Sequence, residues 1–215
     1  MKVLLFGATG SVGNAALEAC ETASIVDEVR AITRRPLINT SPKLRTYVHE
    51  DFLNYATIEE AFRNVDACLF CLGISSTQVS KDDYRTITYS YTLAAANTVK
   101  RHSRGANFHY ISGQGTSSTS RMFWSRVKAQ TEHDLIELID ANCYRPAFID
   151  AKAQPNSPKL YAALAPLGRL FKPFPNLYIH GHDLARAMLQ ATRENLRRCT
   201  FENAAIRQLA SRTSF

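Results

Sequence analysis

The sequence predicts an α/β protein built on a doubly wound parallel sheet with helices on both faces. Short apolar runs rich in β-branched residues alternate with longer segments of helical periodicity along most of the chain, and this order is typical of a parallel sheet. A glycine-rich turn joins the first apolar run to the first helical segment. No internal repeat or low-complexity linker divides the 215 residues, so residues 1–215 are expected to form a single domain.

The first half of the chain holds most of the predicted strands. They are expected at residues 2–6 (KVLLF), 28–33 (EVRAIT) and 66–72 (DACLFCL), with a short additional strand at 46–50 (TYVHE) after a loop that contains two prolines. A helix is expected from Ser11 to about Ser24. A second helix is expected at 57–64, because Thr57 and Glu60 have the spacing of a capping box.

The second half continues the alternation. Helices are expected from Asp82 to about Arg101 and from Phe123 to Leu138, and strands at 107–112 (NFHYIS) and 141–149 (ANCYRPAFI). The segment 182–195 is a clear amphipathic helix, with Leu184, Met188 and Leu189 on its apolar side.

The pattern breaks after Asp150, where residues 151–178 hold five of the eight prolines. This stretch is expected to lie over the carboxyl edge of the sheet, where ligands bind in doubly wound folds. We therefore predict that residues 151–180 form a small C-terminal segment that covers the substrate. A role of residues 157–174 at a membrane surface is the alternative.

Composition is that of a soluble protein, with 45% hydrophobic and 21% charged residues. The apolar runs are much shorter than the roughly 18 residues that a membrane helix needs, and the N-terminal segment lacks the features of a secretory or transit peptide. A cytoplasmic location without a transmembrane segment is expected, and peripheral association with an organelle membrane is left open.

The net charge of +7 favours an anionic ligand. Basic residues are scattered and form no nucleic-acid module, so we expect a small-molecule substrate and no nucleic acid; the oligomeric state is left open. The five cysteines are an odd number, which argues against a disulfide framework. Cys68 and Cys71 lie in a predicted strand and should point to opposite faces as buried structural thiols, and we predict no metal site.

The turn at Gly7, Gly10 and Gly13 has the spacing G-x-x-G-x-x-G between a strand and a helix, the context of a Rossmann-type dinucleotide-binding fold. The first glycine permits the tight turn, the second lets the backbone approach a pyrophosphate, and the third lets helix and strand pack closely. The start of the helix offers free N–H groups and a positive dipole end to the anion.

The end of the second strand predicts which nucleotide is bound. An NAD-selective site usually places an acidic residue there, on the ribose hydroxyls, but this chain has Thr33, Arg34 and Arg35. A guanidinium group pairs with a phosphate through charge-assisted hydrogen bonds and gains much less from a hydroxyl. The cofactor is therefore predicted to be NADP(H).

Together, the motifs GATGSVG, ITRRP, HEDFLN, CLG, YISGQG, VKAQTE, YRPAFI and IHGHDLARAML resemble those of the atypical, extended-type short-chain dehydrogenase/reductases with an NAD(P)H-binding domain. The likeness covers most of the chain and is greatest for the branch with the Tat-interacting oxidoreductase-like protein and its fungal mitochondrial relatives. It implies a set of cofactor-binding residues: Gly7, Thr9, Gly10, Ser11, Val12, Gly13, Arg34, Arg35, Asp51, Phe52, Cys71, Leu72, Gly73, Lys128, Arg145, Pro146 and Ala147.

The same resemblance implies a catalytic group of tyrosine, lysine and serine. Ser112 and Lys128 match the serine and the lysine, but the tyrosine position, four residues before the lysine, holds Trp124. An indole N–H donates a hydrogen bond but does not titrate in the working pH range. The loss of such general acid–base help typically costs about 100- to 10,000-fold in rate.

Other residues are candidates for the missing proton donor. Tyr110 lies two residues before Ser112 on the same strand and should face the same side, although a deeper position in the sheet is favoured. Tyr84, Tyr89 and Tyr91 lie near the helix after the preceding strand, and the sequence does not choose among them. His109 and His133 are interpreted as structural or surface residues.

Two functions from different classes follow. The first is an NADPH-dependent oxidoreductase, atypical in its active site, that acts on a small carbonyl, enone or quinone compound. The second is a non-catalytic NADP(H)-binding regulator or redox sensor. Ser112 and Lys128 favour the enzyme and Trp124 favours the regulator; we favour the enzyme by a small margin.

Overall fold

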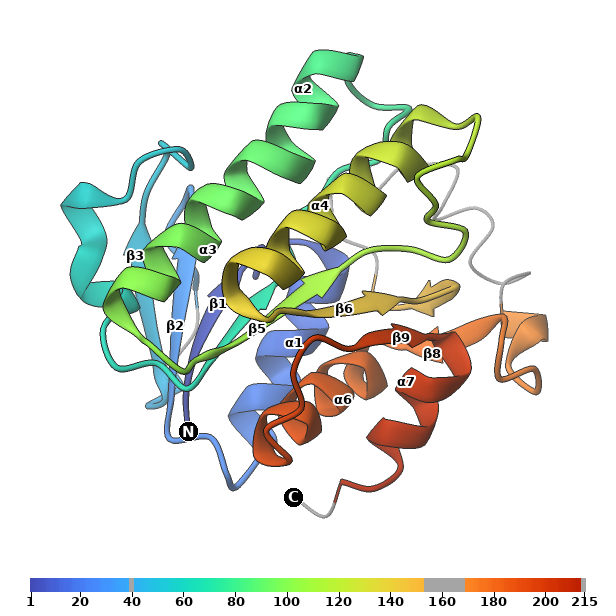
Figure 1. Ribbon diagram of the computed structural model, residues 1–215. Coiled ribbons are helices and arrows are strands. Elements are labelled where there is room, and N and C mark those ends of the chain that lie inside the picture. The colour runs from blue at the N-terminus through green and yellow to red at the C-terminus, as the bar shows by residue number, and fades with distance from the viewer. Residues whose placement is uncertain (39–40, 153–168, 214–215) are drawn as a thin grey trace.

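The computed structural model describes residues 1–38, 41–152 and 169–213. Its centre is a seven-stranded, all-parallel sheet with the strand order β3-β2-β1-β4-β5-β6-β9 (Figure 1). The order reverses between β1 and β4, which is the point where doubly wound sheets bind ligands. The predicted Rossmann-type α/β fold is thereby confirmed. Its strands are β1 (Lys2–Phe6), β2 (Glu28–Thr33), β3 (Leu44–Val48), β4 (Ala67–Phe70), β5 (Asn107–Ile111), β6 (Asn142–Arg145) and β9 (Thr200–Glu202).

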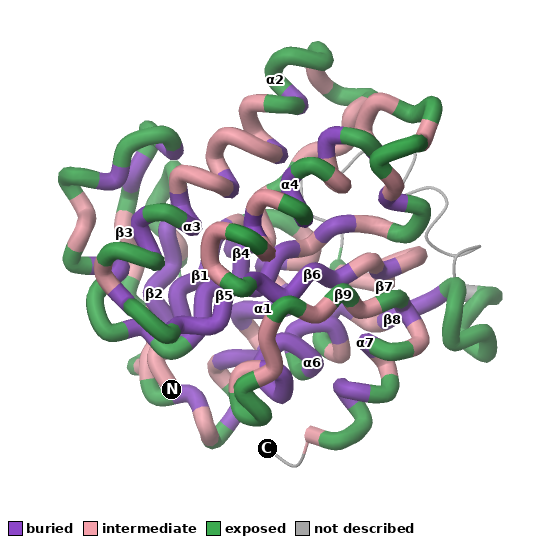
Figure 2. The backbone as a smooth tube through the Cα atoms, viewed as in Figure 1, coloured by how far each residue is buried: buried purple, intermediate pink, exposed green. Residues whose placement is uncertain are grey.

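Helices cover both faces of this sheet (Figure 1). One face packs against α1 (Ser11–Thr22), α6 (Gly181–Arg193) and α7 (Asn203–Ala210). The other packs against the 3₁₀ segment η1 (Ala56–Phe62), α3 (Tyr91–His102) and α4 (Phe123–Ile139). The buried backbone follows the strands and the inner sides of the helices (Figure 2), as expected for strands that are covered on both faces.

A continuous helical stretch leads into α3. It consists of α2 (Lys81–Arg85), the π-helical turn η2 (Thr86–Ser90) and α3. The Ser80 hydroxyl caps its start by accepting a hydrogen bond from the Asp83 N–H, at 3.1 Å. This stretch matches the helix expected from Asp82 to about Arg101.

The helix predicted at 57–64 is wrong in type. The chain forms the 3₁₀ segment η1 with a break at Ile58, and no side chain caps its start. The Asn54 side chain instead accepts a hydrogen bond from the Ala56 N–H, at 3.0 Å. Because Ala61 and Phe62 are fully buried, their packing against the sheet decides the local conformation and the expected capping box at Thr57 does not form.

The strand predicted at 141–149 is two strands. Pro146 separates β6 from β7 (Phe148–Asp150), which pairs outside the main sheet with β8 (Tyr178–His180). Proline has no N–H to donate and restricts the residue before it, so it ends the pairing of β6. β9 and α7 were not predicted, because β9 is short and partly exposed and gives little signal in the sequence.

The predicted covering segment, 151–180, falls largely on residues 153–168, which lie outside the described part of the chain. Its described end contains the short 3₁₀ segment η3 (Arg169–Phe171) and β8. The membrane-surface alternative for 157–174 also falls mainly outside the described residues. In the part that is described, every helix is too short or too polar to cross a lipid bilayer.

The cysteines behave as the sequence predicts. Cys68 packs on the α3 and α4 face of the sheet and Cys71 on the α1 and α6 face, and all five thiols are free. Burial raises the pKa of Cys68 and of Cys71, so both stay protonated and unreactive at neutral pH.

Candidate functional site

The turn between β1 and α1 places the start of the helix at the carboxyl edge of the sheet. Gly7 has a left-handed φ of 79°, and the Gly10 N–H donates to the Gly7 carbonyl oxygen at 2.8 Å. Gly10 occupies the N-cap of α1 and brings no capping side chain, and the first turn holds no acidic residue. Backbone N–H groups and the positive end of the helix dipole suit this position to a pyrophosphate.

Two glycines of this turn have no room for a side chain. A Cβ at Gly7 would lie 2.7 Å from the Cys71 carbonyl carbon and oxygen, and a Cβ at Gly13 would lie 1.9 Å from the Gly7 carbonyl oxygen. The first helix is therefore pressed onto the turn, and the turn onto the end of β4. Cys71 and Leu72 thus border the turn, whereas Gly73 has open space around its Cα.

The two arginines lie where the sequence places them, directly after β2. Arg34 and Arg35 are exposed, and the Thr33 hydroxyl donates to the Arg35 carbonyl oxygen at 2.7 Å, which fixes the turn. Within the described residues neither guanidinium group is in an ion pair. Both groups are thus available to an anion at this edge of the sheet.

Asp51 and Phe52 follow the neighbouring strand, β3, and have different environments. Asp51 is exposed and accepts a hydrogen bond from the Leu53 N–H, at 3.0 Å. Phe52 is buried in a cluster of aromatic rings that includes Phe6 and Tyr91. The buried ring anchors the loop, and the carboxylate of Asp51 remains at the surface.

Lys128 and Ser112 meet at the end of β5. The Lys128 ammonium donates to the carbonyl oxygens of Ile111 and Ser112, at 3.0 and 2.8 Å. The Ser112 hydroxyl is buried and lies 3.0 Å from the Thr116 hydroxyl. An ammonium group has three N–H donors, so a third remains for a ligand such as a ribose hydroxyl. Burial lowers the pKa of Lys128 to about 8, so the ammonium is charged at neutral pH.

Trp124 lies one helical turn before Lys128 on α4 and is half-buried. Its ring covers the loop that follows β5: a Cβ built at Gly113 or at Gly115 would lie 3.9 Å from atoms of the indole. The spacing of four residues puts Trp124 and Lys128 on the same side of the helix. The indole thus occupies the place that the family resemblance gives to a tyrosine.

The four tyrosines considered as substitutes are buried, hydrogen-bonded or packed against other rings. Tyr110 is buried beneath Lys128, whose ammonium lies 5.5 Å from the ring centre, and burial raises the pKa of its hydroxyl well above the usual value. Tyr84 is buried against Phe123, Tyr89 donates to Asp134 at 2.7 Å, and Tyr91 packs on Phe52. The deeper position expected for Tyr110 is confirmed.

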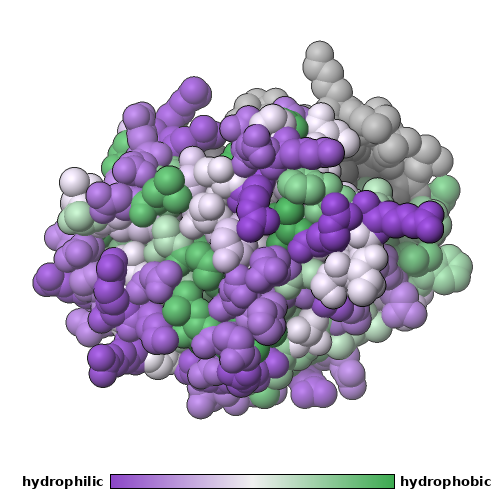
Figure 3. All heavy atoms as spheres, turned by 45° about the horizontal axis from the view of Figure 1, so that its top comes forward, coloured by the Kyte–Doolittle hydropathy of each residue, from purple (hydrophilic) through white to green (hydrophobic). Residues whose placement is uncertain are grey.

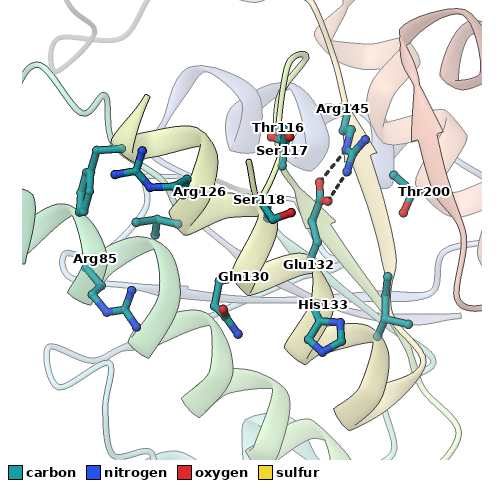
Figure 4. Close-up of a pocket in the computed structure, with 14 residues that line it drawn as sticks. Arg85, Thr116, Ser117, Ser118, Arg126, Gln130, Glu132, His133, Arg145 and Thr200 are labelled. Carbon is teal, nitrogen blue, oxygen red and sulfur yellow. Dashed lines mark hydrogen bonds and ion pairs between the residues drawn. The ribbon is translucent and has the colours of Figure 1, made fainter. Parts of the chain in front are cut away.

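The two histidines are structural or exposed, as expected. His109 is fully buried between the hydroxyls of Tyr144 and Thr192, at 3.0 and 2.8 Å. Burial lowers the pKa of His109 to about 3, so the imidazole is neutral. His133 is exposed on the outer side of α4 and lines a cavity of about 900 Å³ there (Figure 4).

Arg145, which the resemblance assigns to the cofactor site, is held by two carboxylates. Its guanidinium group points toward the Glu132 carboxylate (Figure 4) and binds it with two hydrogen bonds of 2.9 and 2.6 Å. A third nitrogen donates to Glu202 at 3.0 Å. Glu132 was missed in the sequence, although its position four residues after Lys128 places it on the same face of α4.

Pro146 and Ala147 line a cavity of about 440 Å³ beside the loop after β5. The Pro146 carbonyl oxygen accepts a hydrogen bond from the Gln114 N–H, at 2.9 Å, and the Ala147 N–H donates to the Asn203 side chain, at 2.9 Å. Apolar side chains form most of the wall. The lining residues are Gly113, Gln114, Pro146, Ala147, Phe148, Phe171 and Leu177.

The face that carries α2 and α4 is mainly hydrophilic. Figure 3 shows polar side chains over most of its coloured surface, with small apolar areas between them. This distribution is that of a solvated surface.

No family model matches the chain. Among curated proteins, it is 24% identical over 142 residues to "Protein FMP52, mitochondrial" of Candida albicans and 28% identical over 143 residues to the protein of the same name from Eremothecium gossypii. It is 27% identical over 141 residues to "Leucinostatins biosynthesis cluster protein T" of Purpureocillium lilacinum. Each match covers 64% of this chain and 62%, 61% and 52% of the respective relative. The predicted likeness thus holds for fungal mitochondrial proteins and not for the Tat-interacting protein.

Solved structures show the same fold at low sequence identity. MoeE5 in complex with UDP-glucose and NAD matches with a TM-score of 0.69 and 14% identity, over 98% of this chain and 81% of MoeE5. A UDP-N-acetylglucosamine 4-epimerase from Methanobrevibacter ruminantium matches with a TM-score of 0.69 and 16% identity, over 94% of this chain and 76% of the epimerase. The chain therefore shares the Rossmann-type α/β fold of these proteins.

The relatives also correct one expectation. Four of them carry the word "mitochondrial" in their names. The cytoplasmic location predicted from the sequence is therefore contradicted.

The packing of the turn makes a testable prediction. Gly13→Ala should destabilise the protein by about 1–3 kcal/mol, because the new methyl group overlaps the Gly7 carbonyl oxygen and α1 must shift. Gly73→Ala is the matched control and should change stability little, since nothing lies within 4 Å of its Cβ position. Urea unfolding measures both, and equal stability of the two variants would contradict the packing argument.

Proposed function

We propose that this chain binds NADP(H) and is an oxidoreductase for small carbonyl, enone or quinone compounds, with an atypical active site. The observation that carries the proposal is the glycine turn at the start of α1, where Gly10 brings no capping side chain, together with two exposed arginines and no carboxylate at the end of β2. The solved structures with this fold include proteins in complex with NAD, which supports a nicotinamide dinucleotide as the ligand. The choice of the phosphorylated form rests on Arg34 and Arg35.

The residues fit the parts of such a cofactor. The N–H groups of the first turn of α1 would bind the pyrophosphate, and the guanidinium groups of Arg34 and Arg35 the 2′-phosphate. Asp51, at the end of the adjacent strand, would face the adenine side. Lys128 has its third N–H left for the nicotinamide ribose.

The bound cofactor would supply the hydride, and the chain would position the acceptor. The apolar cavity lined by Pro146, Ala147 and Phe148 suits a small, mainly apolar compound. The Ser112 hydroxyl can donate a hydrogen bond to a carbonyl oxygen by turning from Thr116. The Trp124 indole would close the pocket or stack on the nicotinamide. It cannot transfer a proton, so we infer that the preferred acceptors need little proton assistance.

The alternative proposal is a non-catalytic NADP(H)-binding regulator or redox sensor. It is favoured by Trp124 at the tyrosine position, by the burial of Tyr84 and Tyr110, and by the hydrogen bond of Tyr89 to Asp134. The match to the curated relatives covers only about half to three fifths of their length. The activity of the whole protein is therefore itself a proposal.

Arg34→Gln/Arg35→Gln should weaken the binding of NADPH far more than that of NADH. The lost contacts to a charged phosphate are worth about 1.5–3 kcal/mol each, a factor of at least ten in affinity. Lys100→Gln/Arg104→Gln is the control, because it removes two exposed charges near the amino edge of the sheet. Titration calorimetry of both nucleotides measures the ratio, and equal losses for NADPH and NADH would contradict the assignment of the phosphate site.

Trp124 is the single tryptophan of the chain, so its fluorescence reports on the pocket. Saturating NADPH should strongly quench the emission, because the predicted nicotinamide position lies beside the indole and the reduced ring accepts its excitation energy. Unchanged emission at saturation, with binding verified by calorimetry, would place Trp124 away from the nicotinamide.

Trp124→Tyr separates the two functions. Restoring a hydroxyl one turn before Lys128 should raise the rate of NADPH-dependent reduction of a panel of carbonyl compounds. The expected gain is up to about 100-fold, the low end of the range for general acid–base catalysis. Trp124→Phe is the control, since it removes the indole without adding a proton donor. A Tyr variant that binds NADPH and is no faster than the Phe variant would favour the regulator.

A further inference from the structure

Four charged side chains form a row that begins at Lys128. Glu132 lies one turn after Lys128 on α4 and is only 4% exposed. Both of its oxygens accept hydrogen bonds from Arg145, and Arg145 also binds Glu202. The signs of the charges therefore alternate from Lys128, through Glu132 and Arg145, to Glu202 at the sheet edge.

The hydrogen bonds from Arg145 compensate the burial of the Glu132 carboxylate. A buried carboxylate is strongly destabilised unless it is paired and hydrogen-bonded. The planar guanidinium group of Arg145 meets both carboxylate oxygens in the bidentate geometry that makes such pairs strong. The pairing holds the Glu132 carboxylate inside the protein, one helical turn after Lys128 on α4.

The other groups around the Lys128 side chain do not provide such a charge. Burial raises the pKa of each tyrosine and thiol there, so they are neutral at neutral pH. The titratable and charged groups packed around this part of α4 are Tyr110 from β5, Tyr84 from α2, Cys143 and Arg145 from β6, and Glu132 from α4 itself. Among the described residues, Glu132 is thus the negative charge that opposes the effect of burial on Lys128.

We propose that Glu132, clamped by Arg145, is a positioning residue that keeps the Lys128 ammonium charged and seated on the carbonyl oxygens of Ile111 and Ser112. The inference rests on the proposed function, because the seated ammonium acts by donating its third N–H to the nicotinamide ribose. Arg145 then serves the cofactor site through Glu132 and not by contact with the cofactor.

The proposal has a definite pH dependence. Burial lowers the pKa of Lys128 to about 8, and the charge of Glu132 acts in the opposite direction. Neutralising Glu132 must lower that pKa further, so the ammonium is lost at a lower pH. Binding that needs the ammonium is complete well below this pKa and weakens as the pH rises through it.

Glu132→Gln tests the proposal. The affinity for NADPH is measured by titration calorimetry at several values between about pH 6 and 9. The pH at which affinity is halved should fall by about one unit. Affinity should then be about fivefold weaker than in the parent at pH 8 and nearly unchanged at pH 6. Glu137→Gln is the control, since it makes the same chemical change on the same helix, at an exposed residue that pairs with Arg198.

Three further variants keep the test decisive. Lys128→Met should remove this pH dependence, and adding Glu132→Gln to it should cause no further shift. If Glu132→Gln folds poorly, Glu132→Gln/Arg145→Met removes both charges of the pair, so that no guanidinium group is left facing an uncharged residue. This double variant should show the same fall in pH midpoint.

An unchanged midpoint in a folded Glu132 variant would overturn the inference, as would a shift that persists in the Lys128→Met background. A different result overturns the proposed function itself: no binding of NADPH by the parent protein at any pH. The two failures are distinguished by the parent titration, which needs no variant and no substrate.

Discussion

The tight packing of the β1–α1 turn against the end of β4 and against α1 is the constraint on which the rest of the site depends. Gly7 lies against the end of β4 and Gly13 lies against Gly7, with no space for a Cβ at either position. This packing brings the amino end of α1 to the carboxyl edge of the sheet, beside the point where the strand order reverses. The N–H groups of the first helical turn and the positive end of the helix dipole therefore lie at one place, which favours an anion there.

A second helix approaches the same edge from the opposite face. α4 places Trp124, Lys128 and Glu132 along one side, and Lys128 ties the helix to the end of β5. The helix thus presents the Lys128 ammonium and, four residues before it, an indole in place of a titrating hydroxyl. Arg145 holds the buried Glu132 carboxylate one helical turn from Lys128 by two hydrogen bonds.

Secondary structure is predictable from the sequence where a short segment carries its own signal. The strands from β1 to β5 and the helices α1, α3, α4 and α6 follow from hydrophobic period and from the position of glycine. Prediction failed where neighbours distant in the sequence decide the outcome. Buried Phe62 sets the conformation of η1 against the capping signal of Thr57, and β9 exists because it pairs with β6.

The sequence by itself determined the parallel α/β sheet, the glycine turn, the two arginines after β2 and the face of α4 that holds Lys128, because each depends on residues within one or two elements. Tertiary structure alone decided the rest. Arg145 meets Glu132 and Glu202 from positions 13 and 57 residues away, and Tyr110 lies below Lys128 in the core. Side-chain partners across such separations depend on how the elements pack, and local patterns carry no record of that packing.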